Sequence, residues 1–165
     1  MKNLTTTLRA AALFCCLFCA AFTADAQIVN IPDANFKAAL VSSLCVDTNG
    51  DGLGDADADL NNDGEIQVSE ALGVDSLNVS CSLNQLTSLN LQGLNNLQEL
   101  YCDDNQLTIL NLQGLTNLQQ LVCTGNALTS LDVLSLTNLH ILLCSYNLLK
   151  SLSVQNSRYI LFYST

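Results

Sequence analysis

The chain has 165 residues, of which 49% are hydrophobic and 12% are charged, and its formal net charge is −10. No Lys or Arg occurs between Lys37 and Lys150, so the chain lacks the cationic surface through which proteins bind nucleic acids and anionic membranes. The length suits one modest domain with a small appendage, and the acidity is compatible with calcium.

The N-terminal segment has the features of a secretory signal peptide. Lys2 and Arg9 make a positive start, residues 10–22 form an apolar run, and small residues flank Asp25 at the cleavage-determining positions. The run is shorter than the roughly 20 apolar residues of a membrane-spanning helix. We therefore expect residues 1–26 to be removed and no transmembrane segment to remain. The rest of the chain would carry three basic and fourteen acidic residues, a net charge of −11.

Residues 27–76 are predicted to form a small helical cap. A first helix is indicated by apolar residues at helical spacing, and a short second helix should begin near Val68. The first helix is expected over about residues 33–44, with an apolar face formed by Phe36, Leu40, Val41 and Leu44.

An acidic loop lies between these two helices: residues 47–70 contain eight carboxylates and no basic residue. The stretch 59–70 has oxygen-bearing side chains at loop positions 1, 3 and 5, Gly at 6, a hydrophobic residue at 8 and Glu at 12, which is the pattern of an EF-hand calcium loop. An incomplete copy, with Ala58 at its last position, precedes it. The candidate calcium ligands are Asp59, Asn61, Asp63, Glu65 (through its backbone carbonyl), Gln67 and Glu70 in the complete loop, and Asp47, Asn49, Asp51 and Asp55 in the incomplete copy.

Calcium would hold this cap together, because the clustered carboxylates otherwise repel one another and the segment has little other core. The affinity typical of such extracellular sites corresponds to a Kd of about 10⁻⁴–10⁻³ M. The alternative interpretation is a solvated acidic linker that binds no metal.

Residues 77–165 are dominated by a 21-residue repeat with the pattern L-x-C-x-x-N-x-L-T-x-L-x-L-x-x-L-x-x-L. Such repeats stack one unit on the next, because no single unit can bury its own leucines. The pattern predicts a leucine-rich-repeat right-handed solenoid of the α/β-horseshoe class, rich in strand and turn and poor in helix. The repeats cover about residues 77–97, 98–118, 119–139 and 140–160, and an incomplete fifth follows.

Two columns of the repeat are predicted to form a structural ladder. In L-x-C the Leu and the Cys point inward and the residue between them points outward, as in any strand. The Asn that follows leaves the strand in a tight turn and can bond backbone groups of its own and the next coil. A second short strand, such as residues 107–110, should run along the other side of each coil. The two columns are Cys81, Cys102, Cys123 and Cys144, and Asn84, Asn105, Asn126 and Asn147.

The cysteine column is expected to consist of free thiols that act as small hydrophobic groups. The strand spacing of about 4.8 Å would permit disulfides, but side chains that point in parallel do not favour the dihedral angle that a disulfide requires. Nothing like C-x-x-C occurs, which argues against a thiolate metal site.

The 21-residue unit with its cysteine column resembles the cysteine-ladder internalins of pathogenic bacteria. It resembles still more the secreted leucine-rich-repeat proteins of gliding and gut bacteria. In those proteins a segment like residues 31–40 precedes an acidic loop that ends like residues 66–71, and cysteine-type repeats follow. Residues 52–61 look like an insertion in that loop. The resemblance covers the chain from residue 27 onward and implies adhesion or ligand binding, secreted or at the bacterial cell surface, with an extracellular protein or glycan as partner.

No constellation in the sequence points to an enzyme. His140, the only histidine, occupies the repeat position of Gln98 and Gln119, where a solvent-facing turn residue is expected, and it lacks the partner that a catalytic base needs. The sequence therefore favours a non-enzymatic binding or adhesion module. The alternatives are a structural spacer that binds nothing and a truncated fragment of a larger secreted protein.

The predicted contact surface is the outward column of the first strands. Tyr101, Val122 and Leu143 form an apolar stripe with the acidic residues Glu99 and Asp103 beside it, and a spacer would need no such patch. The incomplete fifth coil predicts self-association through the C-terminal edge, because an uncapped coil exposes apolar side chains and an unpaired strand.

Overall fold

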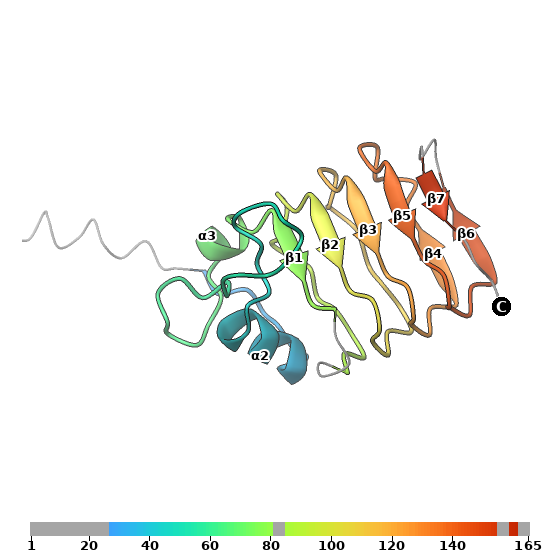
Figure 1. Ribbon diagram of the computed structural model, residues 1–165. Helices are drawn as coiled ribbons and strands as arrows, with labels where there is room; N and C mark the ends of the chain where they lie inside the picture. Colours follow the sequence, from blue (N-terminus) through green and yellow to red (C-terminus); the bar gives the residue numbers. More distant parts are fainter. Residues whose placement is uncertain (1–26, 81–84, 155–158, 162–165) are drawn as a thin grey trace, which may run out of the picture.

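The computed structural model describes residues 27–80, 85–154 and the backbone of residues 159–161. These residues form a small N-terminal cap followed by a row of stacked coils (Figure 1). The predicted signal peptide, Cys81 and Asn84 lie outside the described residues, as does most of the predicted fifth coil.

Each coil contributes one short strand to a parallel five-stranded sheet, in the order β1-β2-β3-β5-β7. Leu100 lies opposite Leu121, and Leu121 lies opposite Leu142, so the three central strands are offset by the 21 residues of the repeat and their equivalent positions stack on one another. The two outer pairs depart from the repeat, because Leu77 lies opposite Leu100 and Leu142 lies opposite Ile160, offsets of 23 and 18 residues. The chain is thus a parallel β-solenoid of about four turns with few helices, which confirms the predicted fold. The strands of this sheet are β1 (Ser76–Asn78), β2 (Glu99–Tyr101), β3 (Gln120–Val122), β5 (Ile141–Leu143) and β7 (Tyr159–Leu161).

A second side of the solenoid forms strands only in the later coils, where β4 (Ser130–Asp132) pairs in parallel with β6 (Ser151–Ser153). The prediction of a strand at residues 107–110 was therefore wrong. In the later coils Lys150 N donates to Thr129 O at 2.9 Å, whereas in the described residues no equivalent bond joins Thr129 to the coil before it. The earlier coils turn along this side without a ladder.

The core is a column of side chains between the two sides of the solenoid. Leu100 and Cys102 are fully buried, while Tyr101 between them is only half-buried, and β3 and β5 repeat this alternation. Each fully buried Leu contributes about 1.5–3 kcal/mol relative to an exposed one. The predicted inward positions of the Leu and Cys residues are confirmed in these three coils.

The cap begins with helix α2 (Ala34–Ser42), which starts at a side-chain cap. The Asp33 carboxylate accepts backbone N–H bonds from Asn35 at 2.9 Å and Phe36 at 3.0 Å, groups that otherwise lack a partner at a helix start. The helix buries Phe36 and Leu40, which belong to the same hydrophobic core cluster as the leucines of the coils. The start of the helix agrees with the sequence prediction.

The predicted C-terminal end of this helix was wrong. Ser43 is extended, with φ −121° and ψ 150°, and this ends the helix two residues early. Leu44 consequently leaves the apolar face and is 68% exposed. A second, one-turn helix, α3 (Val68–Ala71), begins where the sequence predicted it.

The cap also covers the first edge of the parallel sheet. Val46 pairs with Leu77 of β1 in the antiparallel sense, and Asn78 N donates to Cys45 O at 2.6 Å. The segment around Val46 therefore acts as an extra edge strand, which protects backbone groups that an open edge would leave unpaired. None of the helices in the described part of the chain is long and apolar enough to cross a membrane.

Candidate functional site

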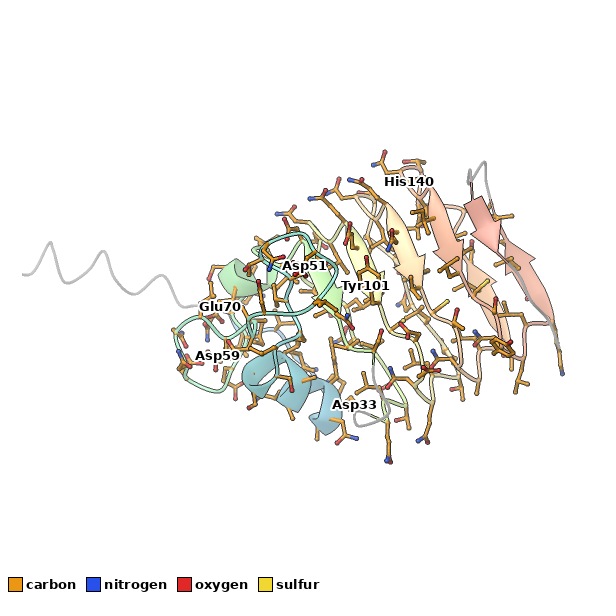
Figure 2. All side chains as sticks on the ribbon, in the orientation of Figure 1. Asp33, Asp51, Asp59, Glu70, Tyr101 and His140 are labelled. Carbon is orange, nitrogen blue, oxygen red and sulfur yellow. The ribbon has the colours of Figure 1, made fainter. Side chains whose placement is uncertain are left out.

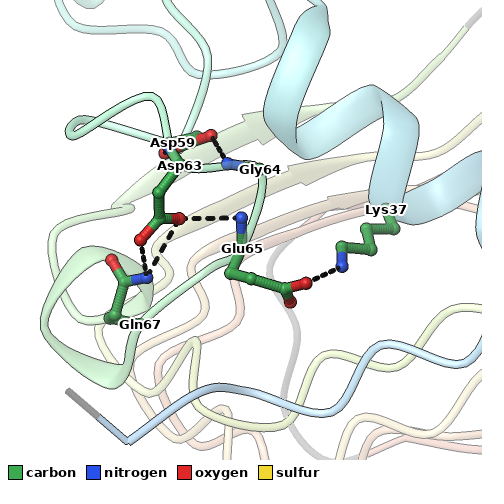
Figure 3. A network of polar contacts seen from close by, with 6 residues as sticks. All are labelled: Lys37, Asp59, Asp63, Gly64, Glu65 and Gln67. Atoms are coloured by element: carbon green, nitrogen blue, oxygen red, sulfur yellow. Dashed lines mark hydrogen bonds and ion pairs between the residues drawn. The ribbon is translucent and has the colours of Figure 1, made fainter. Parts of the chain in front are cut away.

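The EF-hand-like loop, residues 59–70, is folded by its own polar side chains (Figure 3). The Asp59 carboxylate accepts a bond from Gly64 N at 2.8 Å, and the Asp63 carboxylate accepts bonds from Glu65 N at 2.9 Å and Gln67 Nε2 at 3.0 Å. Gly64 has φ +81°, a backbone conformation that residues other than Gly rarely adopt. This explains the Gly at position 6 of the loop.

Glu70, at the last position of the loop, ties the network to helix α3. Its carboxylate accepts bonds from Asn61 N at 3.2 Å and Gln67 N at 2.9 Å, the second of which is part of a capping box. The Glu65 side chain, in contrast, turns away from the loop and binds Lys37 Nζ at 2.6 Å (Figure 3). Five of the six predicted ligand side chains thus belong to one hydrogen-bonded network. The sixth, that of Glu65, lies apart from it, and the prediction used only the backbone carbonyl of Glu65.

The incomplete copy of the pattern folds in the same way. Gly52 N donates to the Asp47 carboxylate at 2.7 Å, Asp51 N donates to Asn49 Oδ1 at 2.9 Å, and Gly52 has φ +84°. Burial opposes ionisation of Asp47, but the backbone N–H groups of Gly52, Gly50 and Asn49 outweigh it, so the pKa of that carboxyl lies below its ordinary value. Asp55 differs from Gln67 at the equivalent position, because it accepts bonds from Thr48 instead of turning into the loop.

The donor chemistry of the complete loop suits a hard cation, since its side chains offer carboxylate and amide oxygens. Asp59 is 3% exposed and Glu70 is 6% exposed, and neither has a cationic partner among the described residues. Buried carboxylates are costly without a counter-charge. The amide nitrogens of Asn61 and Gln67 stand beside Asp63, and within the described ranges no group of three or more His, Cys, Asp or Glu side chains is close enough to hold a metal ion.

The predicted contact surface begins at Tyr101, which is more constrained than an exposed aromatic side chain. Its hydroxyl donates to Glu99 Oε2 at 3.1 Å and accepts a bond from Gln120 Nε2 at 2.6 Å. The incomplete calcium-like loop approaches it, and Asn78 holds that loop by donating to Gly52 O at 3.3 Å. Burial and the nearby Glu99 charge raise the pKa of Tyr101 to about 12.

The rest of this surface lies on β3 and β5. We call the outward side of these strands, with Val122, Leu143 and Ile141, the sheet face. Val122 and Leu143 are half-buried, and so is Ile141 in the adjacent column. Asp103 is held by the hydroxyl of Ser80 in the preceding coil. Figures 1 and 2 show no helix across this part of the sheet, and Tyr101 lies on the same side. The five predicted contact residues therefore do lie on one face, although they are partly rather than fully exposed.

The asparagine column joins each coil to the next. Asn126 Nδ2 donates to the carbonyl of Cys102 in the preceding coil at 2.9 Å and to that of Cys123 in its own coil at 3.2 Å, and its Oδ1 accepts from Leu107 N at 2.9 Å. Asn105 and Asn147 repeat this pattern. The column therefore joins neighbouring coils, but its bonds reach the preceding coil, whereas the sequence prediction named the next one.

The described cysteines are free and buried, as predicted for Cys102, Cys123 and Cys144. Cys45 is a fourth free, buried thiol, and its Sγ lies 3.3 Å from Ala39 O. Burial raises the pKa of Cys144 to about 11, and burial with the charge of Asp57 raises that of Cys45 to about 12. These thiols stay protonated and unreactive at neutral pH, because the thiolate is the nucleophile.

We expect the native protein to react slowly with a thiol reagent at about pH 8 and to react at Cys45, Cys81, Cys102, Cys123 and Cys144 once denatured. The folded-state pKa values of these thiols lie above the ordinary 9.0, so their contribution to stability should be lost as pH rises from 9.0 toward 11 to 12. Thiol counting before and after denaturation, across this pH range, checks both statements. Fast native reaction, or stable disulfides within the column, would contradict them.

His140 is exposed, and its Nδ1 lies 3.3 Å from the carbonyl oxygen of Asn138 in its own turn. No described nucleophile or acid bonds to it. A groove that sequence reasoning missed lies along the same turns. Asn96, Asn117 and Asn138 recur at the 21-residue spacing and face a common groove, and that spacing was the signal that could have revealed them.

No protein-family model and no curated protein sequence matches the chain. Among solved structures, the chain is similar to the functional domain of InlJ from Listeria monocytogenes, which includes a cysteine ladder. The two share 26% identity with a TM-score of 0.50 over 75% of this chain, which spans 26% of that structure's length. The likeness is to a repeat domain and not to an enzyme family. Together with the buried cysteine column, it supports an internalin-like arrangement of leucine-rich repeats, a fold suited to protein interaction.

Proposed function

We propose that the chain is a bacterial binding module, secreted or held at the cell surface, whose sheet face contacts an extracellular protein. The internalin-like fold supports a role in interaction, and the N-terminal apolar segment supports export. Calcium bound by the EF-hand-like loop would stabilise the cap that covers the first coil.

The observation that carries the proposal is the contrast between the two surfaces of the parallel sheet. The inner surface is packed with Leu and Cys, whereas the outer surface keeps Val122, Leu143 and Ile141 half-buried with no described helix over them. Apolar groups bordered by Glu99 and Asp103 resemble the mixed composition of protein contact sites, where an apolar centre has a polar rim.

A binding assay with paired surface variants tests this proposal. The purified chain is applied to immobilised extracellular-matrix proteins, and the double variant Val122→Ser, Leu143→Ser is compared with Ile109→Ser. Ile109 is 74% exposed on another side of the solenoid, so its variant controls for the loss of an exposed apolar group. We expect the sheet-face variant to bind at least about tenfold more weakly, corresponding to about 1.4 kcal/mol. Equal binding by the two variants, or no binding to any matrix protein, would contradict the proposal.

Calcium at the loop is a separate part of the proposal, supported by the oxygen donor set and by the buried, cation-free carboxylates of Asp59 and Glu70. When bound, the ion would supply positive charge to these carboxylates. Asp59, Asn61, Asp63, Gln67 and Glu70 would hold it through side-chain oxygens and Glu65 through its backbone carbonyl. The chain's own contribution is the turn of the loop, which the positive φ of Gly64 and the capping box fix.

We expect calcium at about 10 mM to stabilise the chain by about 1.4–2.7 kcal/mol, if its Kd is about 10⁻⁴–10⁻³ M. Glu70→Gln should abolish most of this gain, because it removes the bidentate ligand while Gln can still serve the capping box. Glu65→Gln is the matched control, since that side chain already points to Lys37. The midpoints of thermal melts with calcium and with chelator measure this gain for the chain and for both variants. Equal midpoints for the unmodified chain, with no heat of binding in calorimetry, would rule out the calcium site.

A further inference from the structure

The turns that precede the strands carry a row of asparagines with fixed orientation. Asn96 Nδ2 donates to Leu72 O at 2.9 Å, Asn117 Nδ2 donates to Asn95 O at 3.1 Å, and Asn138 Nδ2 donates to Thr116 O at 2.9 Å. Each bond reaches back to the preceding coil or the cap. These side chains are exposed, yet the amide nitrogen of each donates to a backbone carbonyl. The three amides therefore repeat at the spacing of the coils.

A groove of about 550 Å³ runs along this row, and we call it the amide groove. Asp75 and Gln98 also line a smaller cavity of about 160 Å³, together with Asp47 and Gly50 of the incomplete calcium-like loop. The turns lie along the upper edge of the solenoid in Figure 2, where His140 is labelled. The polar groups used in the argument below are Asp75, Asn96, Gln98, Asn117, Gln119 and Asn138.

These groups can recognise a ligand with many hydroxyls. A primary amide both donates and accepts, as a hydroxyl does, and the Oδ1 atoms of Asn96, Asn117 and Asn138 accept no bond from another described residue. Gln119 Nε2 donates to Gln98 Oε1 at 2.9 Å, which leaves further donors and acceptors of that pair open to the groove. Among the described residues that line the groove, Asp75 is the one charged group, so an anionic ligand would find no cationic partner there.

The spacing of the amides distinguishes between two kinds of polymer. Stacked strands repeat about every 4.8 Å, whereas an extended peptide advances about 3.3 Å per residue, so a peptide along the groove would fall out of register with the amides. A pyranose ring, in contrast, spans close to one coil spacing. A chain of sugars can therefore present hydroxyls to one coil after another.

We propose that the amide groove binds a neutral glycan chain that lies along the solenoid axis, with the amides of successive coils bonding successive sugars. Asp75 accepts bonds from a pair of neighbouring hydroxyls at the cap end. This site is separate from the sheet face, so its test does not depend on the proposed protein contact.

Calorimetry and side-chain amide NMR with defined oligosaccharides test the proposal. The probes are the hexasaccharides of cellulose, starch, xylan and chitin, with a hyaluronan hexasaccharide as the anionic comparison and an uncharged Gly-Thr repeat peptide as the extended polypeptide. At least one neutral hexasaccharide should bind and shift the Asn and Gln side-chain signals of the groove. The anionic sugar and the peptide should bind more weakly.

The double variant Gln98→Ala, Gln119→Ala should weaken that binding by about tenfold or more. The side chains of these glutamines bond each other and hold no backbone group of another coil, so their replacement should keep the fold, which thermal melts verify. Asn111→Ala with Gln113→Ala, an amide pair in a different groove, is the matched control and should bind as before. No binding of any neutral hexasaccharide up to about 10 mM, tighter binding of the peptide, or equal affinity of the two double variants would overturn the proposal.

Discussion

Replacing Asn126 with Ala should lower the free energy of unfolding by about 3 kcal/mol or more. The Asn126 side chain is largely buried, and it satisfies the carbonyls of Cys102, Cys123 and Thr124 as well as Leu107 N. Ala removes these partners at once, and each buried polar group left unpaired costs about 1–3 kcal/mol. Urea unfolding followed by circular dichroism measures the loss.

Asn111→Ala is the matched control for this prediction. Asn111 is exposed, and its Oδ1 accepts a bond only from Gln113 N, two residues away at 3.1 Å. Its replacement should cost about 0.5 kcal/mol or less, as expected for a surface position. If Asn126→Ala also cost less than about 1 kcal/mol, the column would not be what joins one coil to the next.

Leu121→Ala and Val122→Ala, two neighbours in β3, should differ sharply in their effect on stability. Leu121 is fully buried between Leu100 and Leu142 of the adjacent coils, and truncating such a Leu costs about 2–5 kcal/mol because a cavity remains. Val122 is half-buried on the sheet face, so its truncation should cost about 1 kcal/mol or less. Chemical denaturation of both variants measures the difference. Similar losses would mean that Val122 belongs to the core and not to a contact surface.

The sequence predicted the repeats well, because each inward position recurs every 21 residues and stacking turns such a recurrence into a column. The burial of Cys102 and the cross-coil bonds of Asn126 follow from that recurrence alone. The calcium-like turn of residues 59–64 was also predictable, since Gly64 and the Asp59 carboxylate define it locally.

The cap could be predicted only in part, because its contacts occur once and leave no periodic signal. Nothing in the sequence indicates that Val46 pairs with β1 or that Gly52 is held by Asn78. The spacing of Leu44 matches the apolar face of the predicted helix, but the helix ends before it. Tyr101 was expected to be exposed, whereas its hydroxyl is bonded by residues two positions and one coil away.

The central claim of the account is that successive coils are stacked and joined by asparagine side chains. Three backbone amides report on it directly: those of Leu86, Leu107 and Leu128, which donate to the Oδ1 atoms of Asn105, Asn126 and Asn147 at 3.0, 2.9 and 3.0 Å. All three lie outside strands and helices, so their hydrogen-bond acceptor is a side chain from the next coil and not a backbone carbonyl of a regular element.

Hydrogen exchange of the native chain, resolved by NMR, is therefore the most direct test. Stacked coils predict that the amides of Leu86, Leu107 and Leu128 exchange as slowly as the amide of Leu121 inside β3, because they open only when the solenoid unfolds. The amide of Ile109, in an exposed turn, should exchange fast and serves as the internal comparison. If the three leucine amides exchanged as fast as that of Ile109, the asparagine column would not form and the stacked solenoid would be contradicted.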